Sequence, residues 1–370
     1  MINAVYQLTA PRLLEVTYKE ISLDKSNVII RPLKLSICRA DQRYYQGTRS
    51  QSVLKKKLPM ALIHECVAQV VYDPTGTFKP GDKVIPIPNT PTEQDDVIAE
   101  NYLYSSRFRA SGFDGFLQDY VSCAPDRLVK LPDCVNTTVA AFAELISVSV
   151  HAILRFEKIA HSRRQRLGVW GDGNLGFITA LLIHYMFPEA ELYVMGASHE
   201  KLSYFTFAKE TYHVDHIPEG FNVDHAFECV GGAGSRSAIN QIIDYINPEG
   251  TISIMGVSEN FVDINTRMIL EKGLRMYGSS RSGREDFEKT VELLEAHPEL
   301  SHYLENIVGE EIPVATISDI HEAFRIDYSR NFGKTVMTWN KYWGSPFEKI
   351  VLHFICGIFL YLPHIPFKRE

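Results

Sequence analysis

The sequence predicts an α/β protein of two domains, a β-rich domain of barrel-like character and a doubly wound parallel sheet with helices on both faces. Its 370 residues are long for a single hydrophobic core, which favours two domains. The chain up to about residue 140 contains short β-rich runs separated by Pro and Gly turns. Beyond about residue 165, apolar strands alternate with helices, as is typical of a parallel sheet.

Composition excludes some classes of function. A hydrophobic content of 45% and a charged content of 22% are ordinary for a globular protein, and the net charge of −7 argues against a general nucleic-acid binder. Residues 1–4 do not begin a charged segment followed by an apolar one, so we expect a cytoplasmic protein rather than a secreted one. Six scattered cysteines form no disulfide framework and suit reduced thiols, with one as a candidate metal ligand: Cys38, Cys66, Cys123, Cys134, Cys229 and Cys356.

In the β-rich domain, three runs have the composition of strands. They are residues 27–32, 67–72 and 83–86, and the last follows a turn at Pro80 and Gly81. Residues from about 310 to 340 return to strand-and-turn character, and we expect them to complete this domain.

In the second domain, strands and helices are expected in strict alternation. The turn Asn-Pro-Glu-Gly at residues 247–250 separates a helix from the strand that follows it. Strands are predicted at residues 166–170, 191–195, 223–229 and 251–255, and helices at residues 177–186, 201–210, 237–246 and 285–295.

A glycine-rich turn, Gly171-x-Gly173-x-x-Gly176, lies between the first of these strands and the first helix. The first glycine permits a tight turn, the second lets a pyrophosphate approach the backbone, and the third lets helix and strand pack closely. A pyrophosphate would then bind free N–H groups at the helix start. We predict a dinucleotide site in a Rossmann domain, with a purely structural turn as the alternative. Asn174, Leu175, Cys229 and Val230 complete the expected cofactor contacts of this turn and of the strand end at residue 229.

The end of the second strand of this sheet favours NADP over NAD. NAD-binding chains place Asp or Glu there to hold the ribose 2′-hydroxyl. This chain has Met-Gly-Ala-Ser at residues 195–198, with no carboxylate to repel a 2′-phosphate. Ser198, His199 and Lys201 are the candidate partners for that phosphate. The alternative is that they are ordinary solvated residues of a loop between strand and helix.

Four further residues are candidate metal ligands. A catalytic zinc takes about three ligands from Cys, His, Asp and Glu and keeps one position open. Cys38, His64, Glu65 and Glu144 have the required chemistry, but their wide spacing by itself favours an ordinary structural role, since a lone His or Cys is more often structural.

Five stretches together resemble the medium-chain dehydrogenase/reductase superfamily over most of residues 1–340. The stretch around Glu144 is similar to the zinc-contacting segment of polyol dehydrogenases. The stretches are residues 35–47 around Cys38, 62–70 around His64, 78–84 with Gly81 and Asp82, 112–121 with Gly112 and Gly115, and 141–151 around Glu144.

This resemblance implies a GroES-like catalytic domain beside the Rossmann domain. Residues 1–148 and 306–341 would form the GroES-like domain, and residues 149–305 the Rossmann domain. Residues 342–370 have no counterpart in the family pattern. Their apolar run at residues 350–362 is too short for a spanning helix, which leaves a packed helix, an interfacial membrane anchor or an extension without a role.

The resemblance also implies that Cys38, His64, Glu65 and Glu144 surround one catalytic zinc. Asp41 would orient the His64 ring, although a carboxylate there also suits a turn cap. Residues 89–112 contain no cysteine, so no second, structural zinc is expected.

Two positions depart from the family pattern. Ala40 stands where many relatives have a Ser or Thr that relays a proton, which leaves Glu65 and Glu144 as candidates for proton delivery. Ala68 replaces a usual glycine and affects the strand path rather than the ligands.

Residues 38–45 most resemble bacterial ribulose-5-phosphate reductases. That resemblance implies reduction of D-ribulose 5-phosphate to D-ribitol 5-phosphate with NADPH, for CDP-ribitol and wall teichoic acid or capsule. The phosphate needs cations, and Arg offers it a bidentate fork. Arg43, Arg49 and Arg281 are the preferred candidates among a set that also includes Arg39, Lys55 and Arg284. Arg43 is the first choice because it follows the turn at residues 38–41, although a solvated surface charge is the commoner role for any one of them.

Two other functions stay open. One is a polyol or alcohol dehydrogenase that acts on an unphosphorylated sugar alcohol with NAD(P). The other is a weakly catalytic member that binds a partner, such as the cytidylyltransferase next in the pathway, or a membrane through the tail. A homodimer is expected, with residues 257–264 as a candidate interface.

Overall fold

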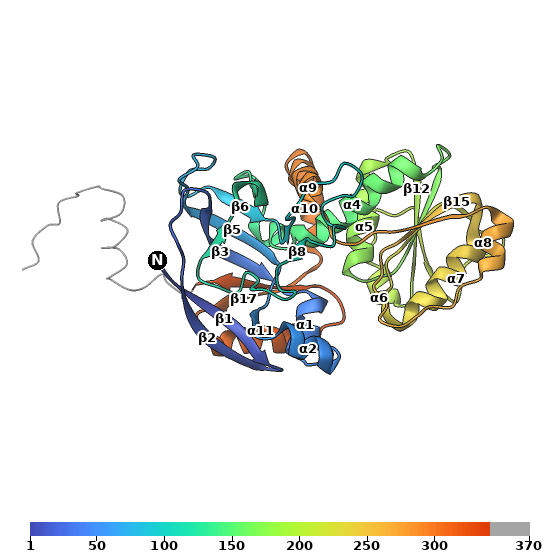
Figure 1. Ribbon diagram of the computed structural model, residues 1–370. Coiled ribbons are helices and arrows are strands. Elements are labelled where there is room, and N and C mark those ends of the chain that lie inside the picture. The colour runs from blue at the N-terminus through green and yellow to red at the C-terminus, as the bar shows by residue number, and fades with distance from the viewer. Residues whose placement is uncertain (341–370) are drawn as a thin grey trace, which may run out of the picture.

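The computed structural model describes residues 1–340, which form two bodies side by side (Figure 1). The first, the β-rich body, contains a sheet of order β10-β6-β5-β3-β18-β17, with β9 paired to β3, and a sheet of order β2-β1-β4. A short hairpin of β7 and β8 lies beside them. Its strands are β1 (Ile2–Ala10), β2 (Leu13–Glu20), β3 (Val28–Ser36), β4 (Met60–Ala61), β5 (Glu65–Tyr72), β6 (Lys83–Pro86), β7 (Asn89–Thr90), β8 (Arg107–Phe108), β9 (Val121–Cys123), β10 (Leu128–Lys130), β17 (Val308–Val314) and β18 (Lys334–Trp339).

The last two strands join the N-terminal ones in one sheet, because β18 pairs antiparallel with β3 and parallel with β17. Helix α11 lies against β17 and β18, and Tyr45 of α1 stacks on Phe324 of α11 with ring centroids 4.3 Å apart. The start of α1 is thereby held against the C-terminal part of the body. The helices are α1 (Arg39–Tyr45), α2 (Gln51–Lys57), α3 (Thr137–Ala140) and α11 (Ile317–Ser329), with a 3-10 turn at Pro125–Arg127.

The second, parallel-sheet body has six strands in the order β13-β12-β11-β14-β15-β16, and every neighbouring pair is parallel. The order reverses at β11, which is where open α/β sheets bind their ligands, beyond the carboxyl ends of the strands. The glycine-rich turn follows β11 directly. The strands are β11 (Arg166–Trp170), β12 (Glu191–Gly196), β13 (Glu210–His213), β14 (Val223–Glu228), β15 (Ile246–Ile254) and β16 (Arg275–Gly278).

Helices cover both faces of this sheet (Figure 1). One face packs on α4, α5 and α9 through Phe156, Ile178 and Leu293, and the other packs on α7 and α8 through Ile242 and Met268. The doubly wound fold predicted from the alternation is confirmed. The helices are α4 (Ala143–Ile159), α5 (Asn174–Met186), α6 (His199–Leu202), α7 (Ser235–Tyr245), α8 (Thr266–Lys272), α9 (Arg284–Ala296) and α10 (Pro298–Glu305), with a 3-10 turn at Gly232–Gly234.

The helix predicted at residues 201–210 is wrong. Only α6 (His199–Leu202) forms, and Glu210 already begins β13. Phe205 and Phe207 both pack on the ring of Phe177, with centroids 5.1 and 5.5 Å away. Residues two apart do not face the same side of a helix, so the chain must leave the helix for both rings to reach Phe177.

Two other expectations need correction. Residues 310–340 contain the 13-residue helix α11, started by a capping box of Thr316 and Asp319, as well as strands. Residues 257–264, the candidate dimer segment, form an irregular loop after β15, and the sheet ends instead at β16.

Between residues 1 and 340, no helix is both long and apolar enough to cross a membrane. The apolar run at residues 350–362, and every interpretation of the tail, lie outside the described residues.

Candidate active site

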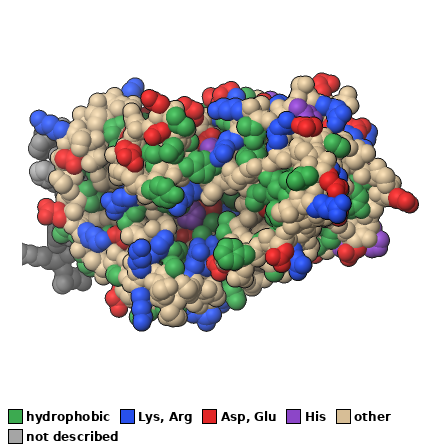
Figure 2. All heavy atoms as spheres, turned by 45° about the vertical axis from the view of Figure 1, so that its right-hand side comes forward, with side chains coloured by type: hydrophobic (Ala, Val, Ile, Leu, Met, Phe, Trp, Pro, Cys, Tyr) green, Lys and Arg blue, Asp and Glu red, His purple; other side chains and the backbone are tan. Residues whose placement is uncertain are grey.

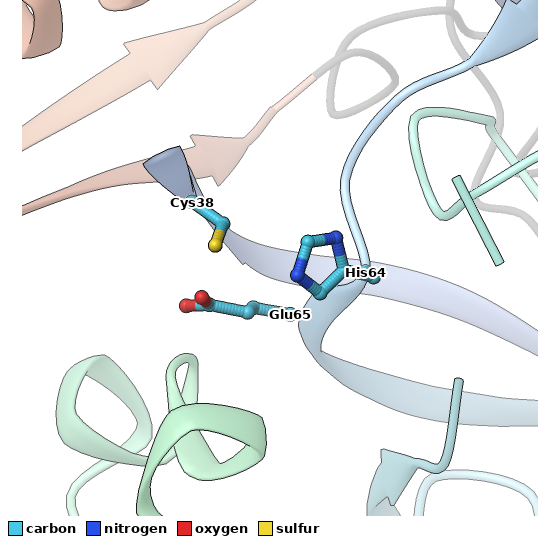
Figure 3. Close-up of side chains that lie close together, drawn as sticks. All are labelled: Cys38, His64 and Glu65. Carbon is cyan, nitrogen blue, oxygen red and sulfur yellow. The ribbon is translucent and has the colours of Figure 1, made fainter. Parts of the chain in front are cut away.

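Cys38, His64 and Glu65 lie together, although 26 positions separate the first two. Cys38 is the N-cap of α1 just beyond β3, and His64 and Glu65 stand at the start of β5. The pairing of β3 with β5 places Ser36 opposite Glu65, so the ends of both strands meet at one edge. The ligand atoms of the three side chains lie within 4.8 Å of one another, and Figure 3 shows them turned toward a common space.

Asp41 is both a helix cap and a neighbour of His64. Its Oδ2 accepts a hydrogen bond from the Cys38 N–H (3.2 Å), and its Oδ1 accepts one from the Ile63 N–H (2.9 Å). The same carboxylate lies 3.6 Å from His64 Nδ1. The structure thus unites both interpretations of Asp41, since capping α1 also fixes a carboxylate behind the imidazole.

Ile63, immediately before His64, adopts an unusual backbone conformation. Its φ of 70° lies in the left-handed region, which a β-branched residue rarely enters. The Ile63 N–H donates to Asp41, and the Ile63 carbonyl accepts a hydrogen bond from the Phe116 N–H (2.7 Å). A Cβ on Gly115 would lie 2.3 Å from that carbonyl oxygen. The packing of residues 115–117 therefore fixes the peptide that aims His64, and strain of this kind gathers at functional sites.

Lys334 is a member of the cluster that sequence reasoning missed. Its Nζ donates to Glu65 Oε1 and lies 2.8 Å from each carboxylate oxygen, and it also donates to the Ile37 carbonyl. Burial alone would lower the pKa of Lys334, but Glu65 and Cys38 raise it. No local motif marks this lysine, because it begins β18 and reaches the site only through the pairing of β18 with β3.

Glu144 stands at the edge of the cluster rather than within it. Its Oε2 lies 4.0 Å from His64 Nε2, and it projects from the first turn of α4. Burial raises the pKa of the Glu144 carboxyl. For His64, burial acts to lower the pKa, but Asp41 and Cys38 raise it well above the usual value. The site therefore concentrates negative charge around one imidazole, an environment suited to a cation.

The donor set fits zinc. A thiol, an imidazole and a carboxylate are zinc's usual protein ligands, and three of them leave a position open for substrate. Glu65 Oε2 is buried, and within residues 1–340 its close polar contact is the Lys334 ammonium at 2.8 Å, so a lone pair is left for a metal. Within residues 1–340 this is the one group of three or more such ligands close enough to hold an ion.

In the parallel-sheet body, a cavity of about 430 Å³ lies beyond the carboxyl ends of β11, β12 and β14. Of the predicted cofactor residues, Gly171, Gly173, Lys201, Cys229 and Val230 line it, whereas Asn174, Leu175, Gly176, Ser198 and His199 do not.

The three glycines of the turn differ in what they require. Gly171 has a φ of 131° and faces Cys229, and a Cβ on Gly176 would lie 1.9 Å from the Gly171 carbonyl oxygen. A Cβ on Gly173 would meet nothing within 4 Å. The protein itself therefore gives no reason for glycine at position 173, whereas a pyrophosphate approaching the backbone there does.

Two carboxylates that the sequence did not mark as functional line this cavity, Asp215 and, within the glycine-rich turn, Asp172. The Asp172 Oδ2 accepts hydrogen bonds from the Ala197 and Ser198 N–H groups, each 2.8 Å long. Because these two hydrogen bonds hold the Asp172 carboxylate against the loop after β12, that carboxylate is less available to repel a 2′-phosphate. Ser198 caps α6, and His199 stacks on His213 with ring centroids 4.8 Å apart.

Asn174 connects the two bodies instead of pointing into the cavity. Its amide nitrogen donates to the Gly333 carbonyl (3.0 Å), and its amide oxygen accepts from the Gly333 N–H (2.9 Å). The start of α5 is thereby tied to the residue before Lys334. These hydrogen bonds therefore link the glycine-rich turn to the strand that carries Lys334 into the metal cluster.

The three arginines predicted for the phosphate lie in different surroundings. Arg43 Nη1 lies 2.5 Å from Glu259 Oε1, and Arg49 Nη1 lies 3.5 Å from the same oxygen. Arg281 instead lies over the ring of Phe108, which packs against His64. Figure 2 shows a face hollowed near its centre, with Lys and Arg side chains beside the hollow.

Comparison with known proteins agrees with this geometry. The model of the alcohol dehydrogenase GroES-like domain matches residues 24–133, and that of the zinc-binding dehydrogenases matches residues 195–296. A ribulose-5-phosphate reductase of Bacillus spizizenii is 54% identical over 339 residues, which cover 92% of this chain and 99% of that protein. The chain belongs to the ribulose-5-phosphate reductase family of zinc-binding dehydrogenases.

Other members of the family are equally similar. Ribulose-5-phosphate reductase 1 of Staphylococcus aureus is 55% identical over 92% of this chain and 99% of its own length. The crystal structure of S. aureus TarJ in complex with NADPH superposes with a TM-score of 0.83 at 49% identity, covering 92% of this chain and 99% of TarJ. The resemblance stated from the motifs, and the fold of a GroES-like and a Rossmann domain, are confirmed.

Proposed function

We propose that this protein is a zinc-dependent reductase that converts D-ribulose 5-phosphate to D-ribitol 5-phosphate with NADPH. The observation that carries this proposal is identity above one half, over nearly the whole length, to ribulose-5-phosphate reductases. The geometry supports it, because a zinc-ligand cluster and a dinucleotide cavity lie in adjoining bodies joined by Asn174 and Gly333. A D-ribitol 5-phosphate product would supply CDP-ribitol for wall teichoic acid or capsule.

When bound, zinc supplies a Lewis acid for the C2 carbonyl and NADPH supplies the hydride. We propose Cys38, His64 and Glu65 as the ligands, with Glu144 at the edge of the site. Asp41 holds the imidazole, and Lys334 holds the Glu65 carboxylate against rotation. These contacts would hold the substrate carbonyl near the nicotinamide. The activation barrier of hydride transfer is then lower, because binding has already oriented the two reactants.

The proton that completes the alcohol product must come from a residue other than Ala40. Ala40 has no hydroxyl, and Glu65 is committed to Lys334. Glu144 is buried near His64, and within residues 1–340 its carboxylate makes no ion pair other than the one with that imidazole. We therefore propose Glu144 as the carboxyl that holds and passes the proton.

The decisive experiment combines metal analysis with a substrate screen. Purified protein should contain one zinc per chain and reduce ribulose 5-phosphate far faster than ribulose, with a lower KM for NADPH than for NADH. Chelation should abolish the activity, and zinc should restore it. Faster reduction of ribulose would instead identify a polyol dehydrogenase. Zinc-loaded protein without reductase activity would point to a partner-binding role.

We propose domains at residues 1–148 with 306–341 and at residues 149–305, a division supported by the pairing of β18 with β3. We also propose a cytoplasmic homodimer, with the uncovered edge strand β16 as the candidate contact in place of residues 257–264. Contact with the pathway's cytidylyltransferase is a further proposal that size-exclusion chromatography of the mixture would test.

A further inference from the structure

An open pocket of about 390 Å³ lies where the two bodies meet near the metal cluster. Residues from the loop between β7 and β8 form one wall, and residues after β16 form the other. Arg281 contributes the one charged side chain of its lining. The lining residues are Asn101, Tyr102, Leu103, Tyr104, Ser106, Ser280 and Arg281.

Arg281 is separated from His64, a proposed zinc ligand, by one aromatic ring. Its guanidinium carbon lies 5.0 Å from the centre of the Phe108 ring, and that ring lies 5.4 Å from the imidazole of His64. The φ of Arg281 is 60°, a left-handed conformation unusual for a residue with a side chain. Backbone strain of this kind persists only where the surrounding structure fixes the residue, and such residues cluster at functional sites.

In the part of the chain that the structure describes, the guanidinium of Arg281 has no anionic partner. Within residues 1–340 it makes no ion pair and donates no side-chain hydrogen bond, although the residue is partly buried. Arg43 and Arg49, in contrast, already share the carboxylate of Glu259. A substrate phosphate would compete with the Glu259 carboxylate at those two guanidinium groups, although the Nε of each has no hydrogen-bond partner within residues 1–340. At Arg281 it would meet no such competing carboxylate.

The wall that faces Arg281 is fixed by a buried network. Asn101 donates through its amide nitrogen to the Ser280 carbonyl (3.0 Å), and the Tyr102 hydroxyl accepts from the Ser280 N–H (3.2 Å). Both side chains also reach His151 Nε2, while His151 Nδ1 lies 2.9 Å from Asp286. The residue before Arg281 is thus clamped, and the pocket is formed without a ligand.

One acceptor in this network is left over. Asn101 is 3% exposed, and its amide oxygen is buried without a hydrogen-bond partner. The orientation of the amide is fixed, because the Ser280 carbonyl can only accept. An unpaired buried acceptor is costly, and a hydroxyl donor from a ligand would satisfy it.

We propose that this pocket binds the phosphorylated end of the sugar, with Arg281 as the phosphate ligand and Asn101 Oδ1 as acceptor for a chain hydroxyl. Arginine presents a fork of N–H donors that matches phosphate oxygens. The pocket thus combines a cation for the phosphate with an acceptor for the polyol, beside the site where C2 would react. This inference deepens the proposed function and depends on it.

The test compares Arg281→Gln and Arg281→Lys with the wild type. In the zinc-loaded enzyme, Arg281→Gln should lower the ratio of kcat/KM for ribulose 5-phosphate over ribulose by about 10- to 100-fold, the range for a hydrogen bond to a charged group. Arg281→Lys should restore part of the ratio, because it keeps the charge without the fork. Arg107→Gln is the matched control, since Arg107 precedes Phe108 on β8 but lies over Phe113. It should keep the wild-type ratio.

A calorimetric titration with inorganic phosphate separates the two levels of the proposal. The wild type and Arg107→Gln should bind phosphate, and Arg281→Gln should lose that binding, whether or not the protein proves to be a ribulose-5-phosphate reductase. Equal phosphate binding by wild type and Arg281→Gln would overturn the assignment. So would a change confined to the KM for NADPH, which would place Arg281 at the cofactor instead.

Discussion

The ammonium group of Lys334 lies 2.8 Å from both carboxylate oxygens of Glu65, a residue 269 positions earlier in the chain. Both side chains are buried, with 4% and 0% of their side-chain surface exposed. A buried pair of this kind offers little net stability when both partners are present, but removing one leaves an uncompensated charge. Lys334 thus fixes the orientation of the Glu65 carboxylate, which we propose as a metal ligand.

Replacing Lys334 with Met should therefore destabilise the protein strongly. We expect the free energy of unfolding of the metal-free variant to be about 3–5 kcal/mol lower than that of the metal-free wild type, measured by urea denaturation. Lys130→Met is the control, because Lys130 pairs with Asp82 at the surface and such pairs contribute about 0–1 kcal/mol. Equal losses in the two variants would contradict this view of Lys334.

Gly173→Ala should damage cofactor binding without damaging the fold. A Cβ at residue 173 meets no protein atom within 4 Å, but it would occupy the approach of the pyrophosphate. We expect an unchanged or slightly higher Tm and a KM for NADPH raised by about tenfold or more. Gly176→Ala should behave in the opposite way and lower the Tm, because its Cβ would lie 1.9 Å from the Gly171 carbonyl oxygen.

Lys201→Ala should reduce the preference for NADPH. Lys201 lines the dinucleotide cavity at the end where the 2′-phosphate is expected. We expect the ratio of kcat/KM for NADPH over NADH to fall by about tenfold, because one charge-assisted hydrogen bond to the phosphate is lost. Lys209→Ala, which removes a lysine paired with Glu191 outside the cavity, should leave the ratio unchanged. A normal ratio in Lys201→Ala would exclude this lysine from the phosphate site.

His225 should make stability depend on pH. Burial and the neighbouring His161 lower its pKa from 6.5 to about 4 in the folded protein. Its Nδ1 accepts a hydrogen bond from the Thr251 N–H (3.0 Å), so a proton on that nitrogen would break the bond. Between about pH 4 and 6.5 the unfolded chain binds more protons than the folded one. Stability present above about pH 6.5 should therefore fall by roughly 2–3 kcal/mol as the pH drops to about 4.

Urea denaturation of His225→Gln across this pH range tests the assignment. The variant should lose much of the decline, because its amide does not titrate. His302→Gln, which alters an exposed histidine, should keep the wild-type dependence. The same decline in His225→Gln as in the wild type would show that other groups cause the loss of stability in acid.

The parallel-sheet body could be predicted well because its signals are local. Each strand is a short apolar run, and the turn after β11 has glycines whose spacing follows from the geometry of one strand and one helix. The prediction failed at residues 201–210, where a tertiary contact overrides local helix propensity. There Phe205 and Phe207 both reach Phe177, and no helix can place residues two apart on one face.

The candidate site divides in the same way. Cys38, His64, Glu65 and Glu144 were identified by chemistry together with a resemblance to known motifs, and the fold places the first three within 4.8 Å. Lys334 and Asn101 were missed, because neither has a neighbour in sequence that marks its role. Lys334 acts through strand pairing, and Asn101 through a buried network with Ser280 and His151.

The sequence by itself determined the fold class, the dinucleotide turn and the chemical types of the metal ligands, since these depend on residue identity and short spacing. Only the tertiary structure decided which charges are paired: Glu65 with Lys334, and Arg43 and Arg49 with Glu259, while Arg281 has no ion-pair partner among the described residues 1–340. The physical reason is that electrostatic partners are chosen by distance in space, and chain positions hundreds of residues apart carry no local record of that distance.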